Sequence, residues 1–481
     1  MESVKSVYNF EQDIRNKINS DDLNGALKYI HLAVEQIFCE PLNSTQIFGS
    51  RLLDDFCQEI GRVNLKKIID NRPIQQSSKQ STIYIATKLQ ASGGHTAVLA
   101  DFIRMSSEAN VHVLVTGLDG STDKDSILHR FKGIENLTFE YAPKVTHIKK
   151  LDWLQARIQE LNPKDVWLFN HHHDSVAIAA VQSSEGYKIH FYHHGDHNLS
   201  LGVYLRNVDH IDPHPMGFHN CREYLGINDN RYIPLTVSDL GVLKKSKFPS
   251  DPNHKLITCT AARSNKVEVN YFIRYVDVIP EMLRASRGVH IHIGNLSYIA
   301  LWTIKRRIKG LGLDPKSFIY IPYVPSLWKF FLDNKVDLYI ASFPYGGGRT
   351  IIEVMGAGIP VAVHSHCLSR FLGGFDMVYE EAFVWRYPEE LYRYISNIDF
   401  KVLESQSVLA RATYLKYHTE SIVIDCINNK SNKKVSVPNL RAGYTPDLFQ
   451  RSVNISNEFG YFRIVKLYMY KKYRWWRSCF S

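Results

Sequence analysis

The residues best suited to chemistry form a short segment in the second half of the chain. Gly346, Gly347 and Gly348 follow an apolar run of strand length, 336–341, and precede a segment with the apolar spacing of a helix, 349–356. Glycines let the backbone approach a ligand closely, and a helix N-terminus offers unpaired N–H groups and the positive end of the helix dipole. The segment therefore predicts a binding loop for an anion, and a diphosphate fits its size.

Two hydrogen-bond donors and one acid follow this loop. Arg349 and Thr350 stand in the first turn of the expected helix, where a guanidinium and a hydroxyl add donors to the same anion. Glu353 is placed to accept hydrogen bonds from the hydroxyls of a ribose or a sugar. The alternatives are a loop that is glycine-rich only for tight packing and a glutamate that is an exposed helix acid.

Further polar groups come directly after strands of the same half. Arg263 and Lys266 follow its first strand, on the rim where the glycine loop also lies. Two cations there would neutralise a diphosphate leaving group without a metal ion, and the alternative is a solvated turn. Tyr323 and Val324 follow the third strand and offer a backbone edge to a nucleobase.

The first half has a matching loop at 92–96. It contains Gly94 and His95 and follows the apolar strand 82–86. Because glycine leaves room, His95 is expected to point toward the ligand, where an imidazole can contact phosphate or move a proton. The alternative is a helix-capping turn with an idle histidine.

Two histidine-rich clusters, 170–174 and 192–197, also follow strands. In the second cluster His194 and Asp196 join an imidazole to a carboxylate, which suits proton abstraction or hydroxyl recognition. The cluster partly matches the H-x-H-x-D-H arrangement of binuclear hydrolases, but Tyr192 stands where that arrangement needs its first histidine. We predict no metal site, and a metal-dependent hydrolase remains the alternative.

The arrangement of elements predicts the fold class. Apolar strands alternate with helix-length segments from residue 81, the alternation stops at a polar linker, 227–253, and it restarts at 255. This alternation predicts an α/β protein with two tandem Rossmann-like domains that face a central cleft, preceded by a helical extension with an N-cap at 20–22. The expected parts are a helical region 1–78, a first Rossmann-like domain 79–245, a second Rossmann-like domain 254–425 and a basic aromatic tail 440–481.

The composition of the chain indicates which classes of binding partner to expect. The chain of 481 residues has a net charge of +10, which favours acidic partners such as nucleotide phosphates or anionic membranes. Its seven cysteines form no C-x-x-C pair and no apolar run reaches the length of roughly 20 residues that spans a membrane, so we expect a cytoplasmic protein. Basic and aromatic residues alternate in the tail, 460–481, which predicts peripheral contact with an anionic membrane at its inner face; no nucleic-acid motif accompanies them.

Over residues 81–425 these features resemble the GT-B glycosyltransferases, whose two Rossmann-like domains enclose a nucleotide sugar. The segment 343–350 with Glu353 and 358–361 is similar to their donor site, Arg263 and Lys266 to their phosphate-binding cations, and Gly94 with His95 to their first-domain loop. The commonest retaining branch carries an E-x7-E pair, whereas this chain has Tyr345 in place of the first glutamate. The glycine loop and the 192–197 cluster look more like the branch of O-GlcNAc transferase and the bacterial cytoplasmic N-glycosyltransferases, and enzymes of bacterial surface polysaccharides are also similar.

The resemblance implies a metal-independent hexosyltransferase without a cofactor. The donor would be a nucleotide diphosphate sugar, UDP rather than GDP, held by the second domain. The acceptor would be a glycan or a protein, held by the first domain, with His95 or Asp196 assisting its hydroxyl or amide. A metal-dependent hydrolase and a non-catalytic glycan-binding protein are the alternatives.

Overall fold

The structure is a computed structural model, and it describes residues 2–39, 47–71, 81–90, 94–106, 108–118, 120, 124–183, 185–242, 255–269, 271–366, 372–428, 436–440 and 469. The chain divides into two compact units. Unit 1 comprises Met1–Ser238 and Leu415–Leu440, and unit 2 comprises Asp239–Tyr414 and Arg441–Ser481. Residues 92–93 of the predicted first-half loop and nearly all of the predicted tail lie outside the described residues.

Unit 1 is built on one seven-stranded sheet with the order β3-β2-β1-β4-β5-β6-β7. Every pairing is parallel, and the central pair aligns Ile83 with Val166 and Ile85 with Leu168. The strands are β1 (Ser81–Ala86), β2 (Val111–Val115), β3 (Leu137–Tyr141), β4 (Pro163–Phe169), β5 (Lys188–Tyr192), β6 (Val208–Asp212) and β7 (Arg231–Tyr232). β1 is buried along its whole length, as expected of a parallel strand that helices cover on both faces.

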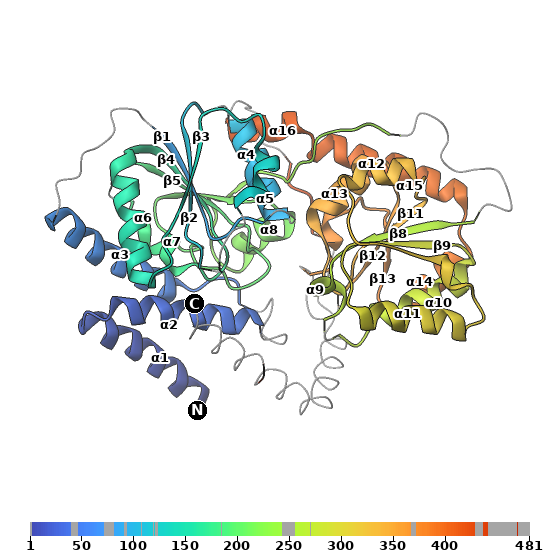
Figure 1. The fold of residues 1–481 in the computed structure, drawn as a ribbon, viewed down its shortest axis with the longest axis horizontal. Helices are drawn as coiled ribbons and strands as arrows, with labels where there is room; N and C mark the ends of the chain where they lie inside the picture. The colour runs from blue at the N-terminus through green and yellow to red at the C-terminus, as the bar shows by residue number, and fades with distance from the viewer. Residues whose placement is uncertain are drawn as a thin grey trace. The chain divides into compact units, whose positions relative to one another are not determined.

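Helices lie on both faces of this sheet (Figure 1). α6 and α7 cover one face, and α4 and α5 lie on the other. The helices of unit 1 are α1 (Glu2–Asn19), α2 (Leu23–Cys39), α3 (Arg51–Asn71), α4 (Gly94–Ser106), α5 (Lys124–Leu128), α6 (His147–Leu161), α7 (Ser175–Ala180), α8 (Pro215–Glu223) and α16 (Glu420–Ile427), with one 3-10 turn, η1 (His129–Phe131). α16 packs on α4, so the chain returns to unit 1 after passing through unit 2.

The N-terminal helices share the core of unit 1. α2 and α3 pack against α6 and α7, and the buried side chains of Leu27, Ile30 and Phe56 belong to the same hydrophobic cluster as the strands. The helices approach closely at Gly61, where a Cβ atom would stand 1.8 Å from the carbonyl oxygen of Ala179. The helical layer is therefore part of unit 1, whereas the sequence treats 1–78 as a separate region.

Unit 2 contains a six-stranded parallel sheet with the order β10-β9-β8-β11-β12-β13. The strands are β8 (Ile257–Ala261), β9 (Val289–Ile293), β10 (Phe318–Ile321), β11 (Leu338–Ile340), β12 (Val361–His364) and β13 (Phe383–Trp385). The helices are α9 (Ser264–Val267), α10 (Tyr275–Ser286), α11 (Tyr298–Gly310), α12 (Leu327–Asp333), α13 (Gly348–Gly356), α14 (Pro388–Ser396) and α15 (Phe400–Tyr417), with 3-10 turns η2 (Pro315–Ser317) and η3 (Phe375–Met377). α10, α11 and α14 lie on one side of the sheet, and α12, α13 and α15 lie on the other (Figure 1).

The apolar runs of strand length are strands in the structure, with small shifts at their ends, and the α/β prediction with two parallel sheets is confirmed. These runs are 82–86, 111–115, 165–170, 188–193, 255–259, 289–293, 318–321, 336–341 and 359–363. The predicted linker 227–253 begins too early. β7 lies inside it, and Ile233 and Leu235 beyond β7 are buried, because the apolar side chains of this stretch outweigh its polar composition. β6 is missing from the predicted set, because Asp209, His210 and Asp212 interrupt its apolar pattern. The edge strands β3, β7 and β13 are missing as well.

Among the described residues, no helix combines the length and the apolarity needed to cross a membrane.

Candidate active site

The glycine loop opens α13 as the sequence predicts. Gly347 is the N-cap residue, and the first backbone hydrogen bond of the helix runs from Ile351 N to Gly347 O at 3.0 Å. The N–H groups of Gly348, Arg349 and Thr350 therefore have no carbonyl partner within the helix. Buried apolar side chains on the far side of α13 fix the direction of the helix: Ile351, Ile352, Val354 and Met355.

Gly346 is needed for close packing of the loop against the segment 372–374, in addition to the room that it leaves for a ligand. Its N–H donates a hydrogen bond to Leu372 O at 2.6 Å, and a Cβ atom at this position would stand 2.6 Å from Gly373 O. Any larger residue would push the loop away from the segment 372–374. The tight-packing alternative therefore holds for Gly346, and it coexists with an open helix N-terminus two residues further on.

Lys266 contacts this loop directly. Its Nζ donates a hydrogen bond to Gly346 O at 2.8 Å, and Tyr345 N donates to Lys266 O at 3.3 Å. Burial lowers the pKa of Lys266 to about 8, and the positive charge of Arg263 acts in the same direction. An anion bound beside Lys266 would relieve both effects.

Arg263 begins the same turn. It is the N-cap residue of α9 and is exposed, and the next residue, Ser264, donates its N–H to Asn295 O at 2.8 Å. That hydrogen bond ties the turn to the chain that leaves β9. Arg263 and Lys266 therefore both lie at the carboxyl edge of the sheet, and Lys266 reaches the glycine loop.

The other residues predicted to bind the nucleotide sugar also lie at the carboxyl edge of the sheet of unit 2, some near the glycine loop and some further away. Arg349 and Glu353 are one helical turn apart on α13, with Arg349 Nε 3.8 Å from Glu353 Oε1, and both are partly buried. Tyr323 and Val324 follow β10, which lies two strands from β8 in the sheet. Tyr323 is 67% exposed, so its edge is accessible, and its role toward a nucleobase stays a prediction.

Aromatic rings that the sequence prediction omitted stack beside the loop. The ring of His366 lies nearly parallel to Tyr345, with centroids 6.2 Å apart, and to Tyr271, with centroids 4.9 Å apart. Tyr271 Oη lies 2.7 Å from His364 Nε2, and burial lowers the pKa of His364 to about 3. The sequence contained a signal for these residues. His364 is the last residue of β12 and His366 follows that strand. β12 is the neighbour of β11, the strand that leads into the glycine loop.

In unit 1, His95 lies among other histidines. Its ring centroid is 4.6 Å from that of His194 and 4.8 Å from that of His171. Burial and the neighbouring His171 lower the pKa of His95 to about 3, so His95 is neutral at pH 7. An interaction with the backbone of Phe169 acts in the opposite direction but is weaker. His95 and His194, predicted separately, therefore form one group.

Asp196 has a different partner from the one expected. His214 Nδ1 lies 2.7 Å from Asp196 Oδ2, while His197 Nδ1 is 3.6 Å from Asp196 Oδ1. Burial opposes the ionised form of Asp196, but the charge of His214 and hydrogen bonds outweigh burial and lower its pKa. Asp196 is 1% exposed, so it is placed to orient His214 rather than to meet a ligand. The sequence signal for His214 was its position two residues after β6, between Pro213 and Pro215.

The 170–174 cluster contains a structural acid. Asp174 is fully buried and caps α7, accepting a hydrogen bond from Ala177 N at 2.9 Å. The hydroxyls of Thr87 and Thr116 each donate to its Oδ2 at 2.6 Å. Asp174 therefore joins the ends of β1 and β2 to α7 and is unavailable to a ligand.

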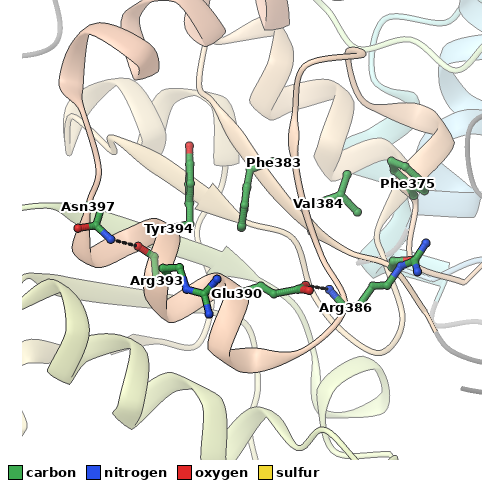
Figure 2. Close-up of a pocket in the computed structure, with 9 residues that line it drawn as sticks. Phe375, Phe383, Val384, Arg386, Glu390, Arg393, Tyr394 and Asn397 are labelled. Carbon is green, nitrogen blue, oxygen red and sulfur yellow. Dashed lines mark hydrogen bonds between the residues drawn. The ribbon is translucent and has the colours of Figure 1, made fainter.

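A groove of about 760 Å³ lies elsewhere in unit 2, beside β13 and α14 (Figure 2). Arg386 N donates to Glu390 Oε2 at 2.7 Å within its wall, and Arg393 also lines it. Ser365, the residue before His366, also lines the groove. None of the predicted site residues lines it.

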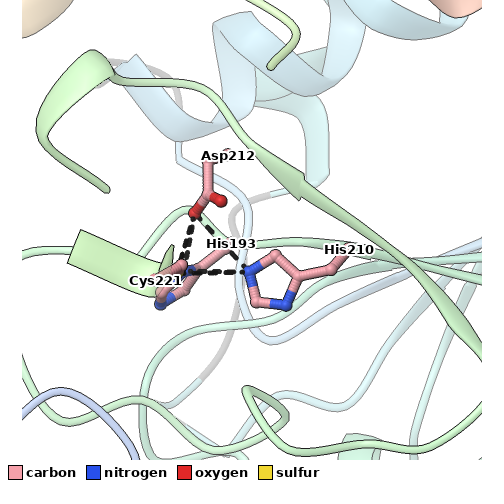
Figure 3. Close-up of side chains that lie close together, drawn as sticks. All are labelled: His193, His210, Asp212 and Cys221. Atoms are coloured by element: carbon pink, nitrogen blue, oxygen red, sulfur yellow. Dashed lines mark hydrogen bonds and ion pairs between the residues drawn. The ribbon is translucent and has the colours of Figure 1, made fainter. Parts of the chain in front are cut away.

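One group of described residues has the composition of a metal centre. His193, which the sequence placed in the 192–197 cluster, meets His210, Asp212 and Cys221 in the interior of unit 1 (Figure 3). It is a different group from the one formed by His95 and His194.

A scan of protein-family models and a search of curated proteins each gave no match. Solved structures do match the fold. The lipopolysaccharide outer core galactosyltransferase WaaB, in its apo form, has a TM-score of 0.53 at 13% identity, over 73% of this chain and 100% of WaaB. A glycosyltransferase from Rickettsia africae has a TM-score of 0.54 at 14% identity, over 73% and 100% of the two chains. HepE from Anabaena, in complex with UDP and glucose, has a TM-score of 0.53 at 13% identity, over 73% and 98%. The chain therefore has the GT-B glycosyltransferase fold, as predicted.

Proposed function

We propose that this chain is a glycosyltransferase that moves a hexose-type sugar from a nucleotide diphosphate donor, with UDP favoured, to a glycan or protein acceptor. The observation that carries the proposal is the hydrogen bond between Lys266 Nζ and Gly346 O. It holds an ammonium group against the loop that opens α13, so a cation and a helix N-terminus adjoin one small space. Such a pair suits an anion of diphosphate size.

The donor side of the reaction follows from this loop. Transfer breaks the bond between the anomeric carbon and the β-phosphate oxygen, and the bonding electrons leave with the nucleotide diphosphate. Lys266, Arg263 and the amides of Gly348–Thr350 would stabilise that charge, which is the task a metal ion performs in other enzymes. Glu353 would accept hydrogen bonds from sugar or ribose hydroxyls.

The acceptor side is assigned to His95 and its neighbours. The acceptor oxygen or nitrogen bonds to the anomeric carbon and loses a proton, which a neutral imidazole can accept. His95 is neutral at pH 7 and lies beside the rings of His171 and His194. With a pKa of about 3 His95 is a weak base, so the role of a base requires that binding of the acceptor raise this pKa. Asp196 would act through His214.

The alternatives make different demands on the molecule. A hydrolase needs a metal with an open coordination position, whereas the four-residue group around His193 is buried and its ligand atoms face one another. A glycan-binding protein would bind the nucleotide sugar without turnover. Donor-dependent release of UDP by the purified chain separates an enzyme from that case.

A thermal-shift screen with UDP, GDP, CMP and their sugars tests the proposal, because a ligand that binds the native state raises the melting temperature. We expect the largest shift with UDP or a UDP-sugar. Lys266→Met should reduce the shift, while Lys305→Met, which removes an exposed lysine of α11, should keep it. No shift with any nucleotide, or an unchanged shift in Lys266→Met, would count against the proposal.

Location is a separate part of the proposal. We place the protein in the cytoplasm, with the tail 460–481 in peripheral contact with an anionic membrane, as its alternation of basic and aromatic residues suggests. Flotation with anionic and with neutral liposomes tests this contact. Unchanged flotation after deletion of 460–481 would contradict it.

A further inference from the structure

Four side chains with metal-ligating atoms meet inside unit 1 (Figure 3). His193 directly follows β5, His210 and Asp212 lie in β6, and Cys221 lies in α8. His210 is 3% exposed, and the other three are fully buried. Polar groups gathered so far from water need compensation for their lost hydration.

The ligand atoms are nearly equidistant. His210 Nε2 lies 3.4 Å from His193 Nδ1, and Cys221 Sγ lies 3.5 Å and 3.6 Å from His193 Nδ1 and His210 Nε2. Asp212 Oδ1 lies 2.9 Å from His193 Nδ1, 3.5 Å from His210 Nε2 and 3.4 Å from Cys221 Sγ. These six separations are the edges of a tetrahedron with one ligand atom at each corner.

A tetrahedral zinc site has edges of this length. With metal–nitrogen and metal–oxygen bonds of about 2.0–2.2 Å and metal–sulfur bonds of about 2.3 Å, neighbouring ligand atoms lie about 3.3–3.6 Å apart. Five of the six separations fall in that range. The His193–Asp212 separation of 2.9 Å is shorter and would open slightly around an ion.

Hydrogen bonding within the group explains the arrangement less well. Asp212 Oδ1 would have to accept from His193, His210 and Cys221 at once, more donors than its two lone pairs serve well. The separation of 3.4 Å between His210 Nε2 and His193 Nδ1 also exceeds the usual length of a hydrogen bond from an N–H group, about 2.7–3.2 Å. A shared central ion accounts for all six separations together.

We propose that this group binds one Zn²⁺ ion through His193 Nδ1, His210 Nε2, Asp212 Oδ1 and Cys221 Sγ. A thiolate and a carboxylate supply two negative charges, which a divalent cation neutralises inside the protein. Imidazole and thiolate together favour zinc over magnesium or calcium, which prefer oxygen ligands. Because the protein supplies all four ligands, the ion has no open position and its role is structural.

The surroundings fit a structural centre. Asp212 Oδ2 accepts a hydrogen bond from Asn230 Nδ2 at 2.7 Å, which fixes the orientation of the carboxylate. The ion would fasten β5 and β6 to α8. The chain that carries His194 and Asp196 starts at His193, and His214 follows Asp212 by two residues. The site would therefore anchor both ends of the region assigned to the acceptor.

This inference departs from the sequence-based expectation that the chain has no metal site. The sequence pointed to the 192–197 cluster and rejected it because Tyr192 replaces a histidine. The structure uses His193 from that cluster and adds ligands from β6 and α8, which the linear pattern does not connect.

Elemental analysis of the full-length protein, purified without added metal, tests the inference. We expect about one zinc per chain, falling to less than a fifth of that in Cys221→Ser and in His210→Ala. Cys259→Ser removes a buried cysteine of unit 2 and should keep its zinc. Lys266→Met should also keep it, which separates this inference from the proposed function.

Cobalt substitution keeps the test decisive if the ligand variants fail to fold. The protein stripped of metal and reloaded with Co²⁺ should show the strong visible absorption of tetrahedral cobalt and a near-ultraviolet thiolate-to-cobalt band, and chelation should lower its melting temperature. Wild-type protein that neither contains zinc nor takes up Zn²⁺ or Co²⁺ stoichiometrically would overturn the inference. Retention of full zinc in a folded Cys221→Ser variant would do the same.

Discussion

Lys266 and Gly346 lie eighty residues apart in sequence, yet Lys266 Nζ donates a hydrogen bond to the Gly346 carbonyl at 2.8 Å. The parallel sheet brings them together, because β8 pairs with β11 and both strands release their chains at the same edge. The contact leaves the remaining N–H donors of Lys266 next to the N-terminus of α13. Under the proposed function, recognition of an anion at this edge would therefore depend on both segments.

Replacing Lys266 with methionine should weaken binding of a UDP-sugar by about 10–100-fold, because one charge-assisted hydrogen bond contributes about 1.5–3 kcal/mol. Lys266→Arg keeps the charge and should lose less. Isothermal titration calorimetry of both variants beside Lys305→Met measures the effect. Equal affinities across the three variants would show that the diphosphate binds elsewhere.

The affinity for the nucleotide sugar should depend on pH through Lys266. Its pKa of about 8 in the free protein means that the amine is charged below pH 8 and loses its proton above it. Affinity should therefore be constant from pH 6.5 to about 8 and fall by up to about tenfold per pH unit beyond, until the higher pKa of the complex is reached. Lys266→Arg should flatten the profile, and a profile that stays the same in this variant would assign the titration to another group.

The folding stability of the ligand-free protein should rise with pH, whereas its affinity for the nucleotide sugar should fall. An unfolded lysine has a pKa of about 10.4, so between pH 8 and that value the unfolded chain binds more protons than the folded one. Stability of the free protein should therefore rise with pH across this window. Lys266→Met should remove that rise and stabilise the free protein by about 1–3 kcal/mol at pH 7. Denaturant titrations at pH 7 and pH 9 measure both effects.

Gly346→Ala tests the packing of the loop. The added Cβ would stand 2.6 Å from Gly373 O, a backbone atom that cannot move alone, so we expect a loss of about 1–3 kcal/mol in stability and weaker donor binding. Gly310→Ala is the matched control, because nothing lies within 4 Å of its Cβ at the end of α11. Chemical denaturation compares the two. If Gly346→Ala is as stable as the control, the segment 372–374 must move away from the added methyl group at no cost in stability.

Asp174→Ala should destabilise unit 1 without a direct effect on ligands. The change leaves the hydroxyls of Thr87 and Thr116 and the N–H of Ala177 without their acceptor, at a cost of about 3–5 kcal/mol. Glu160→Ala removes a more exposed acid of α6 and serves as the control. Melting temperatures of the two variants test the assignment, which fails if Asp174→Ala melts like Glu160→Ala.

The sequence predicts the sheets well where strands are continuous apolar runs. β1, β2, β9 and β10 are of this kind and lie where expected. It fails at β6 and β7, which carry aspartate, histidine and arginine whose partners come from neighbouring strands. His190, for example, lies 2.8 Å from both Asp165 and Asp209, a bridge across β4, β5 and β6 that no local pattern contains.

Some residues of the candidate site can likewise be predicted from a local sequence pattern, and others cannot. The glycine loop is visible in one segment of sequence, and so is the strand-end position of Lys266. Groups assembled from several strands are not: His214 with Asp196, His366 with Tyr271, and Cys221 with His193 all join separate elements. The sequence gives the residue types of such groups, and only tertiary structure selects the partners.

The last prediction concerns His95. If this imidazole accepts the proton of the acceptor, His95→Asn should reduce transfer by about 10²–10⁴-fold, the usual contribution of a general base. Donor binding should stay unchanged, because the donor loop belongs to unit 2. UDP release and sugar transfer, measured beside the thermal shift with UDP, separate the two effects. His219→Asn alters a histidine of α8 that bonds to Pro438 O at 2.9 Å and should keep full activity. Loss of the thermal shift in His95→Asn would instead assign this residue to donor binding, and full transfer activity would remove it from the reaction.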